Sequence, residues 1–327
     1  MSAPLPQLSR RAVMKSVAAA FAAGSVSSIA TDWGRAQENT AAAPSKKKAS
    51  KYIDVHTHIG TTWNGNKELT PELLLSWMDE HDIEKAVLLP LTSPESSSFL
   101  LLTEPALKAA KEHPDRFIPF CSIDPRTSVV GGVKGFKDVV QSYVDKGAKG
   151  FGEHKVGLDF NDPLMMRIYE VCQDVGIPLL FHCDNLRGKD KPGLPNLEDA
   201  LKSFPKLNFI GHGPGFWASI SGDIDAKDLG GYPTGPVKPG GALDTLMEKY
   251  PNLFCDLSAG SGAQAISRDK AFGREFMIRR QDRLLFGTDY LQPGQAVPQF
   301  EVFDSLNLPE TVQAKVYRQN AIRVLKL

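Results

Sequence analysis

Five of the seven histidines and one aspartate stand where short apolar runs of the sequence end. The runs are DVHTH, FGEHK, LLFHCD, FIGHG and LLFGTD, and the residues are His56, His58, His154, His182, His212 and Asp289. Short β-rich apolar runs predict strands, and the parallel strands of a barrel bring their carboxyl ends to one small area. Imidazoles and a carboxylate gathered there are ligands for a divalent metal ion. We therefore expect a metal centre.

Each of these residues suits a particular role. His56 and His58 are two positions apart, so on a strand they lie on one face and both point into the barrel. His182 supplies a third imidazole ligand. Asp289 can bind metal and also accept a proton from water, which makes it a catalytic base. His212 is a second catalytic candidate, as a ligand of a second metal or as a proton donor to the substrate.

The fourth strand leaves two alternatives open. Strand alternation directs either Glu153 and Lys155 or His154 into the barrel. Glu153 in the barrel could bridge two metal ions, and Lys155 could hold a carboxylate of the substrate. The sequence does not decide between the two faces.

Three further residues are candidates for substrate binding. Arg126 and Arg187 follow the third and fifth strands, where either could clamp an anionic group with two hydrogen bonds, or lie solvated in a loop. Trp217 follows His212 and either walls the mouth of the site or packs under the loop.

The elements that must position these residues alternate along the chain. Strands are predicted at 52–57, 85–90, 117–122, 149–154, 178–183, 207–212, 253–257 and 283–288, with helical patterns such as 71–81, 136–147 and 163–176 between them. Eight strands alternating with helices predict a (β/α)8 TIM barrel. An open sheet is less favoured because the first strand ends in HTHIG and not in a glycine-rich phosphate loop. The polar, glycine-rich segment 221–241 is a candidate lid.

Length and charge fit a single barrel behind an N-terminal segment. The chain has 327 residues and a formal net charge of zero; without a basic stripe, nucleic acid is not expected as a partner. The body has no apolar run that could span a bilayer. Arg10, Arg11 and Lys15 precede a weakly apolar stretch and resemble a bacterial twin-arginine export signal. We expect a signal at 1–36, a disordered linker at 37–50, a barrel at 51–327, and export to the periplasm by the twin-arginine machinery.

The whole set of sequence patterns resembles the amidohydrolase superfamily, in particular its amidohydrolase-related group. The resemblance covers about Tyr52 to Leu327 and rests on DVHTHIG, PLLFHCD, FIGHG, LLFGTD and the closing YRQNAIRVLKL. It implies a distorted barrel with one or two divalent metals, commonly zinc, with manganese or iron as alternatives. The chain departs from many relatives on the fourth strand, where it reads GFGEHK in place of a lysine followed by histidine and proline.

Two reactions fit this resemblance. The first is metal-dependent hydrolysis of an ester, lactone or amide bond in a small polar or anionic substrate. The second is metal-dependent, non-oxidative decarboxylation of an unsaturated or aromatic carboxylic acid. An acidic bridge at Glu153 favours hydrolysis, whereas a basic clamp at Arg126 or Arg187 with an aromatic wall favours decarboxylation. A metal-binding protein without turnover is a third hypothesis, and association of identical chains stays open.

Overall fold

The computed structural model describes residues 51–327. The expected signal (1–36) and linker (37–50) lie outside the described residues. Eight parallel strands form two hydrogen-bonded groups, in the orders β1-β2-β3 and β4-β5-β6-β7-β8. Their bounds are β1 Tyr52–Thr57, β2 Ile83–Leu88, β3 Phe117–Pro119, β4 Phe151–His154, β5 Leu179–His182, β6 Phe209–His212, β7 Leu253–Asp256 and β8 Leu284–Leu285.

Single bridges join the two groups of strands into a closed barrel. Between β3 and β4, Cys121 pairs with Phe151 in parallel. Between β8 and β1, Thr57 pairs with Tyr290, and the amide of Val55 donates to the carbonyl of Phe286 at 2.9 Å. Closure confirms the predicted TIM barrel and brings the carboxyl ends of all eight strands to one rim.

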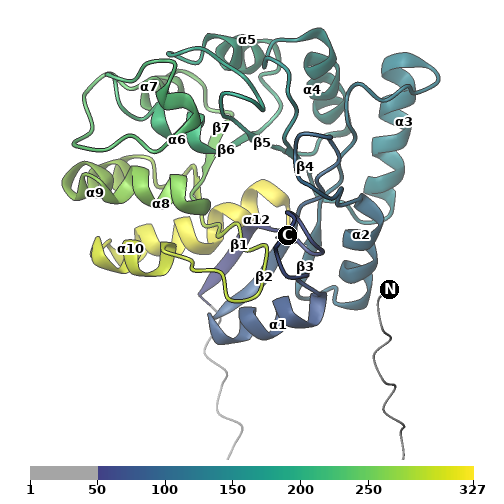
Figure 1. Ribbon diagram of the computed structural model, residues 1–327, viewed down its shortest axis with the longest axis horizontal. Helices are drawn as coiled ribbons and strands as arrows, with labels where there is room; N and C mark the ends of the chain where they lie inside the picture. Colours follow the sequence, from purple (N-terminus) through teal and green to yellow (C-terminus); the bar gives the residue numbers. More distant parts are fainter. Residues whose placement is uncertain (1–50) are drawn as a thin grey trace, which may run out of the picture. The chain divides into compact units, whose positions relative to one another are not determined.

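Helices surround the strands (Figure 1). Their bounds are α1 Pro71–Glu80, α2 Thr103–Glu112, α3 Gly132–Asp145, α4 Pro163–Val175, α5 Pro195–Ser203, α6 Pro214–Ala218, η1 Asp228–Gly230, α7 Ala242–Lys249, α8 Ala259–Ser267, α9 Lys270–Arg279, α10 Gln299–Ser305, α11 Glu310–Ala314, η2 Lys315–Gln319 and α12 Asn320–Leu325. Local sequence explains several of these ends. Thr70 and Asp162 cap α1 and α4 with their side-chain oxygens, and Gly176 ends α4 in the left-handed conformation.

The apolar core has two layers. The larger layer lies between the strands and the helices. The smaller fills the barrel with residues such as Ile53, Val55, Leu180 and Ile210, and α12 packs against it. Because Ile53 and Val55 point into the barrel, strict alternation of side chains along β1 would direct His56 out of the barrel. However, β1 shifts register relative to β2 between Asp54 and Thr57. This irregularity accompanies the inward placement of the histidine pair.

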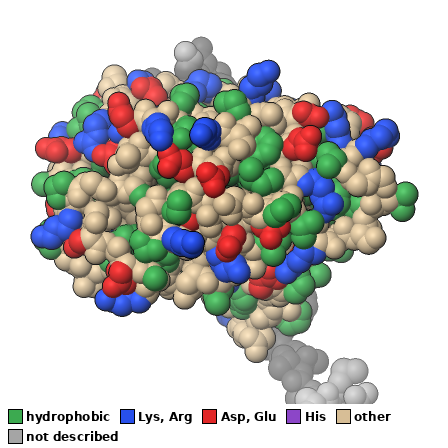
Figure 2. Space-filling model, turned by 90° about the horizontal axis from the view of Figure 1, so that it is seen from above, with side chains coloured by type: hydrophobic (Ala, Val, Ile, Leu, Met, Phe, Trp, Pro, Cys, Tyr) green, Lys and Arg blue, Asp and Glu red, His purple; other side chains and the backbone are tan. Residues whose placement is uncertain are grey.

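The 221–241 segment is fastened at several points. The amide of Gly222 donates to the carbonyl of Lys238 at 2.9 Å, and Arg268 donates to the carbonyl of Pro233 at 3.0 Å. These contacts hold the segment against itself and against α8. On the face drawn in Figure 2, basic, acidic and apolar side chains are interspersed. Within residues 51–327, the structure contains no helix long and apolar enough to cross a membrane.

Candidate metal centre

The first group of donors is built around the histidine pair of β1. The Nε2 atoms of His56 and His58 are 3.2 Å apart. Oδ1 of Asp289 lies 3.5 and 3.4 Å from them, and Oε2 of Glu153 lies 3.7 and 3.6 Å from them. In tetrahedral zinc coordination, two nitrogen ligand atoms lie about 3.3 Å from each other. The four side chains are therefore spaced as ligands of one ion.

A second group of donors shares Glu153. Its other oxygen, Oε1, lies 2.8 Å from Nδ1 of His182 and 3.8 Å from Nε2 of His212. The three sets with metal-ligand spacing are His56–His212–Asp289, His56–His58–Glu153 and Glu153–His182–His212. Glu153 thus lies between two clusters of imidazoles with one oxygen directed at each.

The chemistry of Glu153 fits a bound cation. The side chain is 1% exposed, and its Oε2 atom has no hydrogen-bond partner. Burial alone would raise the pKa of this carboxyl, but Lys155 and His182 hold it well below its usual value. A buried, ionised oxygen without a partner is costly, and a divalent cation among the neighbouring imidazoles would satisfy it. The residues present therefore fit a metal of the kind that the resemblance implies.

The local structure of β4 settles which side faces inward. Gly152 has φ +138°, and a Cβ atom there would lie 2.3 Å from the carbonyl oxygen of Leu180, so only glycine fits. The register with β5 shifts between Phe151 and His154. Glu153 points to the histidines, whereas His154 points away, with Nε2 3.1 Å from the sulfur of Met165.

His154 is therefore not placed among the metal donors. Burial lowers its pKa to about 4, so it is neutral at physiological pH. Lys155 accompanies Glu153, with Nζ 3.4 Å from Oε1 and the side chain 11% exposed. Of the two alternatives left open by the sequence, the structure has Glu153 and Lys155 on the inner side.

Two residues that sequence reasoning missed orient the imidazoles. Oδ2 of Asp256, at the end of β7, lies 2.6 Å from Nδ1 of His56, and both residues are fully buried. Ser258 donates to the same oxygen at 2.8 Å, and its hydroxyl lies 2.8 Å from Nδ1 of His212. Partners on Nδ1 leave Nε2 of each ring for the ion. The position of Asp256 at the end of an apolar run, LFCD, was the available signal.

The remaining members of the first donor group are also fixed by neighbours. Nδ1 of His58 lies 2.9 Å from the carbonyl oxygen of Leu89, which again directs Nε2 to the centre. Asp54 accepts from the amides of His56 and Thr288, both at 3.0 Å, and so ties β1 to the segment after β8. Asp289 has φ +58°, an uncommon conformation for a residue with a side chain.

Asp289 is the donor that reaches solvent. Its side chain is 20% exposed, whereas the four histidine residues of the centre are at most 5% exposed. Burial alone would raise the pKa of Asp289, but His56 and His58 outweigh it and keep the pKa below its ordinary value. The carboxylate is therefore ionised at neutral pH.

The two candidate arginines are engaged by neighbouring carboxylates. Arg126 binds Asp124 at 2.6 Å and Glu95 at 2.9 Å. Arg187 binds Asp184 at 2.6 Å, and the same carboxylate oxygen lies 2.8 Å from Nε2 of His182. Arg187 therefore reaches the centre only through Asp184, and neither guanidinium is free to clamp a ligand in this arrangement.

Trp217 packs under the loop. It is 1% exposed, and its indole nitrogen donates to the carbonyl oxygen of Asp256 at 3.0 Å. Of the two alternatives for this residue, the structure has the buried one, because the indole fills space beneath β7 and its single donor is already used. Trp217 therefore supports the site from below and does not line its mouth.

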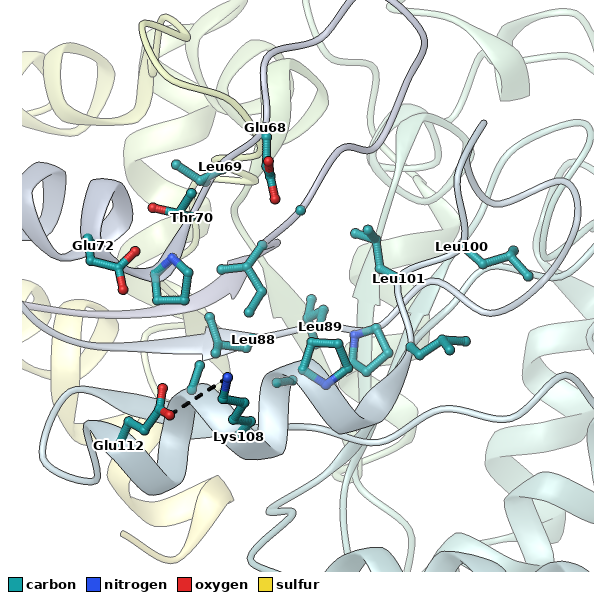
Figure 3. Close-up of a pocket in the computed structure, with 18 residues that line it drawn as sticks. Glu68, Leu69, Thr70, Glu72, Leu88, Leu89, Leu100, Leu101, Lys108 and Glu112 are labelled. Carbon is teal, nitrogen blue, oxygen red and sulfur yellow. Dashed lines mark ion pairs between the residues drawn. The ribbon is translucent and has the colours of Figure 1, made fainter.

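One cavity near the rim is separate from the centre. It has a volume of about 470 Å³ and lies between the starts of α1 and α2, with Leu69, Leu88 and Leu101 in its lining. Figure 3 shows these leucines around the space and an ion pair between Lys108 and Glu112 at its edge. Its lining contains no histidine, so it lies apart from the donors described above.

A family model agrees with this geometry. The amidohydrolase model matches residues 101–327, which is more than half of the chain. The chain belongs to the amidohydrolase family. The matched part includes Glu153, His182, His212 and Asp289, whereas the histidine pair of β1 precedes it. Amidohydrolases are generally metal-dependent enzymes. No curated protein matches the sequence significantly.

Solved structures support the same fold. An uncharacterised TIM-barrel protein from Bordetella bronchiseptica is 19% identical, with a TM-score of 0.61 over 84% of this chain and 98% of that chain. A probable 2-pyrone-4,6-dicarboxylic acid hydrolase from Acinetobacter baumannii, with citric acid bound, is 14% identical, with a TM-score of 0.54 over 85% and 100%. A 5-carboxyvanillate decarboxylase from Novosphingobium aromaticivorans, complexed with manganese and a nitrobenzoic acid, is 16% identical, with a TM-score of 0.54 over 85% and 97%. At these identities the likeness concerns the fold alone.

Proposed function

We propose that this amidohydrolase is a hydrolase with two divalent ions, which cleaves an ester, lactone or amide bond of a small polar or anionic substrate. The observation that carries the proposal is the position of Glu153. One oxygen lies beside the imidazoles of β1 and the other beside those of β5 and β6, as a carboxylate shared by two ions requires. Zinc suits this set of imidazoles and carboxylates, and manganese or iron are the alternatives.

The ligands divide into two groups. His56, His58 and Asp289 would hold one ion with Oε2 of Glu153, and His182 and His212 would hold the other with Oε1. Bound ions would lower the pKa of water and polarise the carbonyl of a substrate. In this arrangement His212 would serve as a ligand, since its Nδ1 is engaged by Ser258 and its Nε2 faces Glu153.

Proton transfer falls to Asp289. Its Oδ1 faces the imidazoles of His56 and His58, so Oδ2 remains to accept a proton from the attacking water. The carboxylate is ionised, as a general base at neutral pH must be, and its side chain is partly exposed. The same group can then return the proton to the leaving group.

The anionic substrate is inferred from Lys155. Its ammonium has Glu153 as a carboxylate neighbour at 3.4 Å, and that carboxylate is committed to the ions in this proposal. The ammonium is then available to an anionic group of the substrate. Trp63, from the loop after β1, has its ring centroid 5.8 Å from Nζ of Lys155 and would form an apolar wall beside that group.

Decarboxylation is the competing reaction, and metal content separates the two. We expect two equivalents of metal per chain by elemental mass spectrometry, and at most one in Glu153→Gln. Glu170→Gln, an exposed change on α4, is the matched control and should keep both. Hydrolysis is then assayed with a panel of ester, lactone and amide substrates, each with and without a carboxylate group. Decarboxylation is assayed as CO2 release from unsaturated and aromatic carboxylic acids. One equivalent with CO2 release would establish decarboxylation, and no metal after reconstitution would refute both reactions.

A further inference from the structure

A second cavity lies at the opposite end of the barrel from the metal centre. It has a volume of about 720 Å³ and is lined by Phe117, at the start of β3, by Lys149, just before β4, and by the last residues described, Lys326 and Leu327. Phe117 and Lys149 stand at the amino ends of β3 and β4, whereas the metal donors lie at the carboxyl ends of their strands. The cavity is therefore independent of the proposed hydrolase site.

The charged side chains in the lining of this cavity have one sign. It includes six lysines and no aspartate or glutamate, and the lysines are Lys85, Lys108, Lys111, Lys146, Lys149 and Lys326. They come from β2, from α2, and from the residues just after α3, just before β4 and just after α12. In a chain whose net charge is zero, such a gathering of ammonium groups is local and creates a positive field inside a concave surface.

These ammonium groups are poorly compensated by the described residues. Of the six, only Lys108 forms an ion pair, with Glu112 at 3.9 Å. Lys85 and Lys326 donate to backbone carbonyl oxygens at 2.8 and 3.1 Å, which leaves their charge without a counterion. By contrast, Lys134 on the outer surface of α3 pairs with Asp138 at 2.7 Å. The lysines around the cavity are therefore available to an external anion.

The floor of the cavity is apolar. Leu107, Phe117, Ile118 and Leu327 contribute to the lining. Phe117 and Ile118 are each 3% exposed, whereas Leu107 is half-buried and Leu327 is 41% exposed. A ligand with an apolar body would cover Leu107 and Leu327 and gain free energy from the apolar area removed from water. The volume is within the range of pockets that hold small organic ligands.

We propose that this cavity binds a small anionic amphiphile, with a carboxylate, sulfonate or phosphate head among the lysines and an apolar body on Leu107 and Leu327. Charge complementarity selects the head, and the exposed apolar side chains of the lining select the body. A concave site of this size favours a single soluble molecule over a membrane surface.

The test uses the full-length, metal-loaded protein and two probes. Binding of 1-anilinonaphthalene-8-sulfonate is followed by fluorescence, and binding of laurate by calorimetry. We expect saturable binding that weakens with salt, and at least a roughly tenfold rise in Kd in the Lys111→Gln/Lys149→Gln variant, the change from losing about 1.4 kcal/mol. The matched control, Lys134→Gln/Lys137→Gln on the outside of α3, should bind like the unmodified chain. Circular dichroism and metal content verify that each variant is folded.

Three results would overturn the proposal. Equal Kd values in the Lys111→Gln/Lys149→Gln variant and its control would place the probes elsewhere. Binding of neutral dodecanol as tight as that of laurate would mean that the lysines do not select the head. Binding to phosphatidylglycerol vesicles without binding to either soluble probe would assign the lysines to a membrane surface.

Discussion

Replacing Asp256 with asparagine tests how the centre is supported. The carboxylate accepts from Nδ1 of His56 at 2.6 Å, with both groups fully buried. An asparagine amide in the same position presents a donor to Nδ1, so the ring proton must move to Nε2, where it blocks coordination. If the asparagine side chain flips to avoid this, its NH2 group faces the backbone N–H of Ser258, which in the unmodified chain donates to Oδ1 of Asp256 at 3.0 Å. Either arrangement loses a buried hydrogen bond or a ligand.

We expect the affinity for metal to fall roughly 10–100-fold, as when such supporting carboxylates are lost elsewhere. Competition with a chromogenic chelator measures it at neutral pH. Asp190→Asn is the matched control, because Asp190 binds backbone amides at the start of α5 and contacts no histidine of the centre. Metal affinity of Asp256→Asn within about threefold of the unmodified chain, in a folded protein, would refute the assigned role of Asp256.

Three further predictions follow from other parts of the chain. Burial lowers the pKa of His154 from 6.5 to about 4, so between these pH values the unfolded chain binds more protons than the folded chain. The free energy of unfolding therefore falls as the pH falls through this range, by at most about 3 kcal/mol. Urea unfolding of the metal-free protein should show a smaller fall in this free energy for His154→Leu. Gly152→Ala places Cβ 2.3 Å from the carbonyl oxygen of Leu180, and should destabilise the fold by roughly 2–4 kcal/mol in urea unfolding and reduce bound metal. Lysines in place of Arg10 and Arg11 should abolish periplasmic export of a fused reporter, whereas undiminished export would reject the twin-arginine signal.

The barrel was predictable because its signals are local and repeated. Eight apolar runs alternate with helical patterns, and caps such as Thr70 and Asp162 act on their own helices. The bounds were less accurate for β8, which is confined to Leu284–Leu285 although the apolar pattern predicts 283–288. Strand assignment depends on pairing with β7 as well as on composition, and this pairing covers only two residues.

The candidate site was predictable to the extent that its residues end strands. The choice at β4 was not, because strict alternation fails where Gly152 accompanies a register shift. Asp256 was missed because its partner, His56, is 200 positions away, and a lone aspartate after a strand is more often a turn residue. The pairing of Arg126 with Asp124 had a visible signal, since a carboxylate two positions away competes for the guanidinium.

The placement of the donors also explains why the family does not determine the substrate. The donors come from β1, β4, β5, β6 and the segment after β8, so the centre forms only when the barrel closes and varies little with its loops. Among the donors, Asp289 reaches solvent. Selection must therefore fall to other groups near the centre, such as Lys155, which contacts Glu153, and Trp63 beside it; they belong to segments after β4 and β1. Loops of this kind change independently of the barrel that carries them. The charge and shape around Lys155, and not the fold, are what a substrate screen should be designed to match.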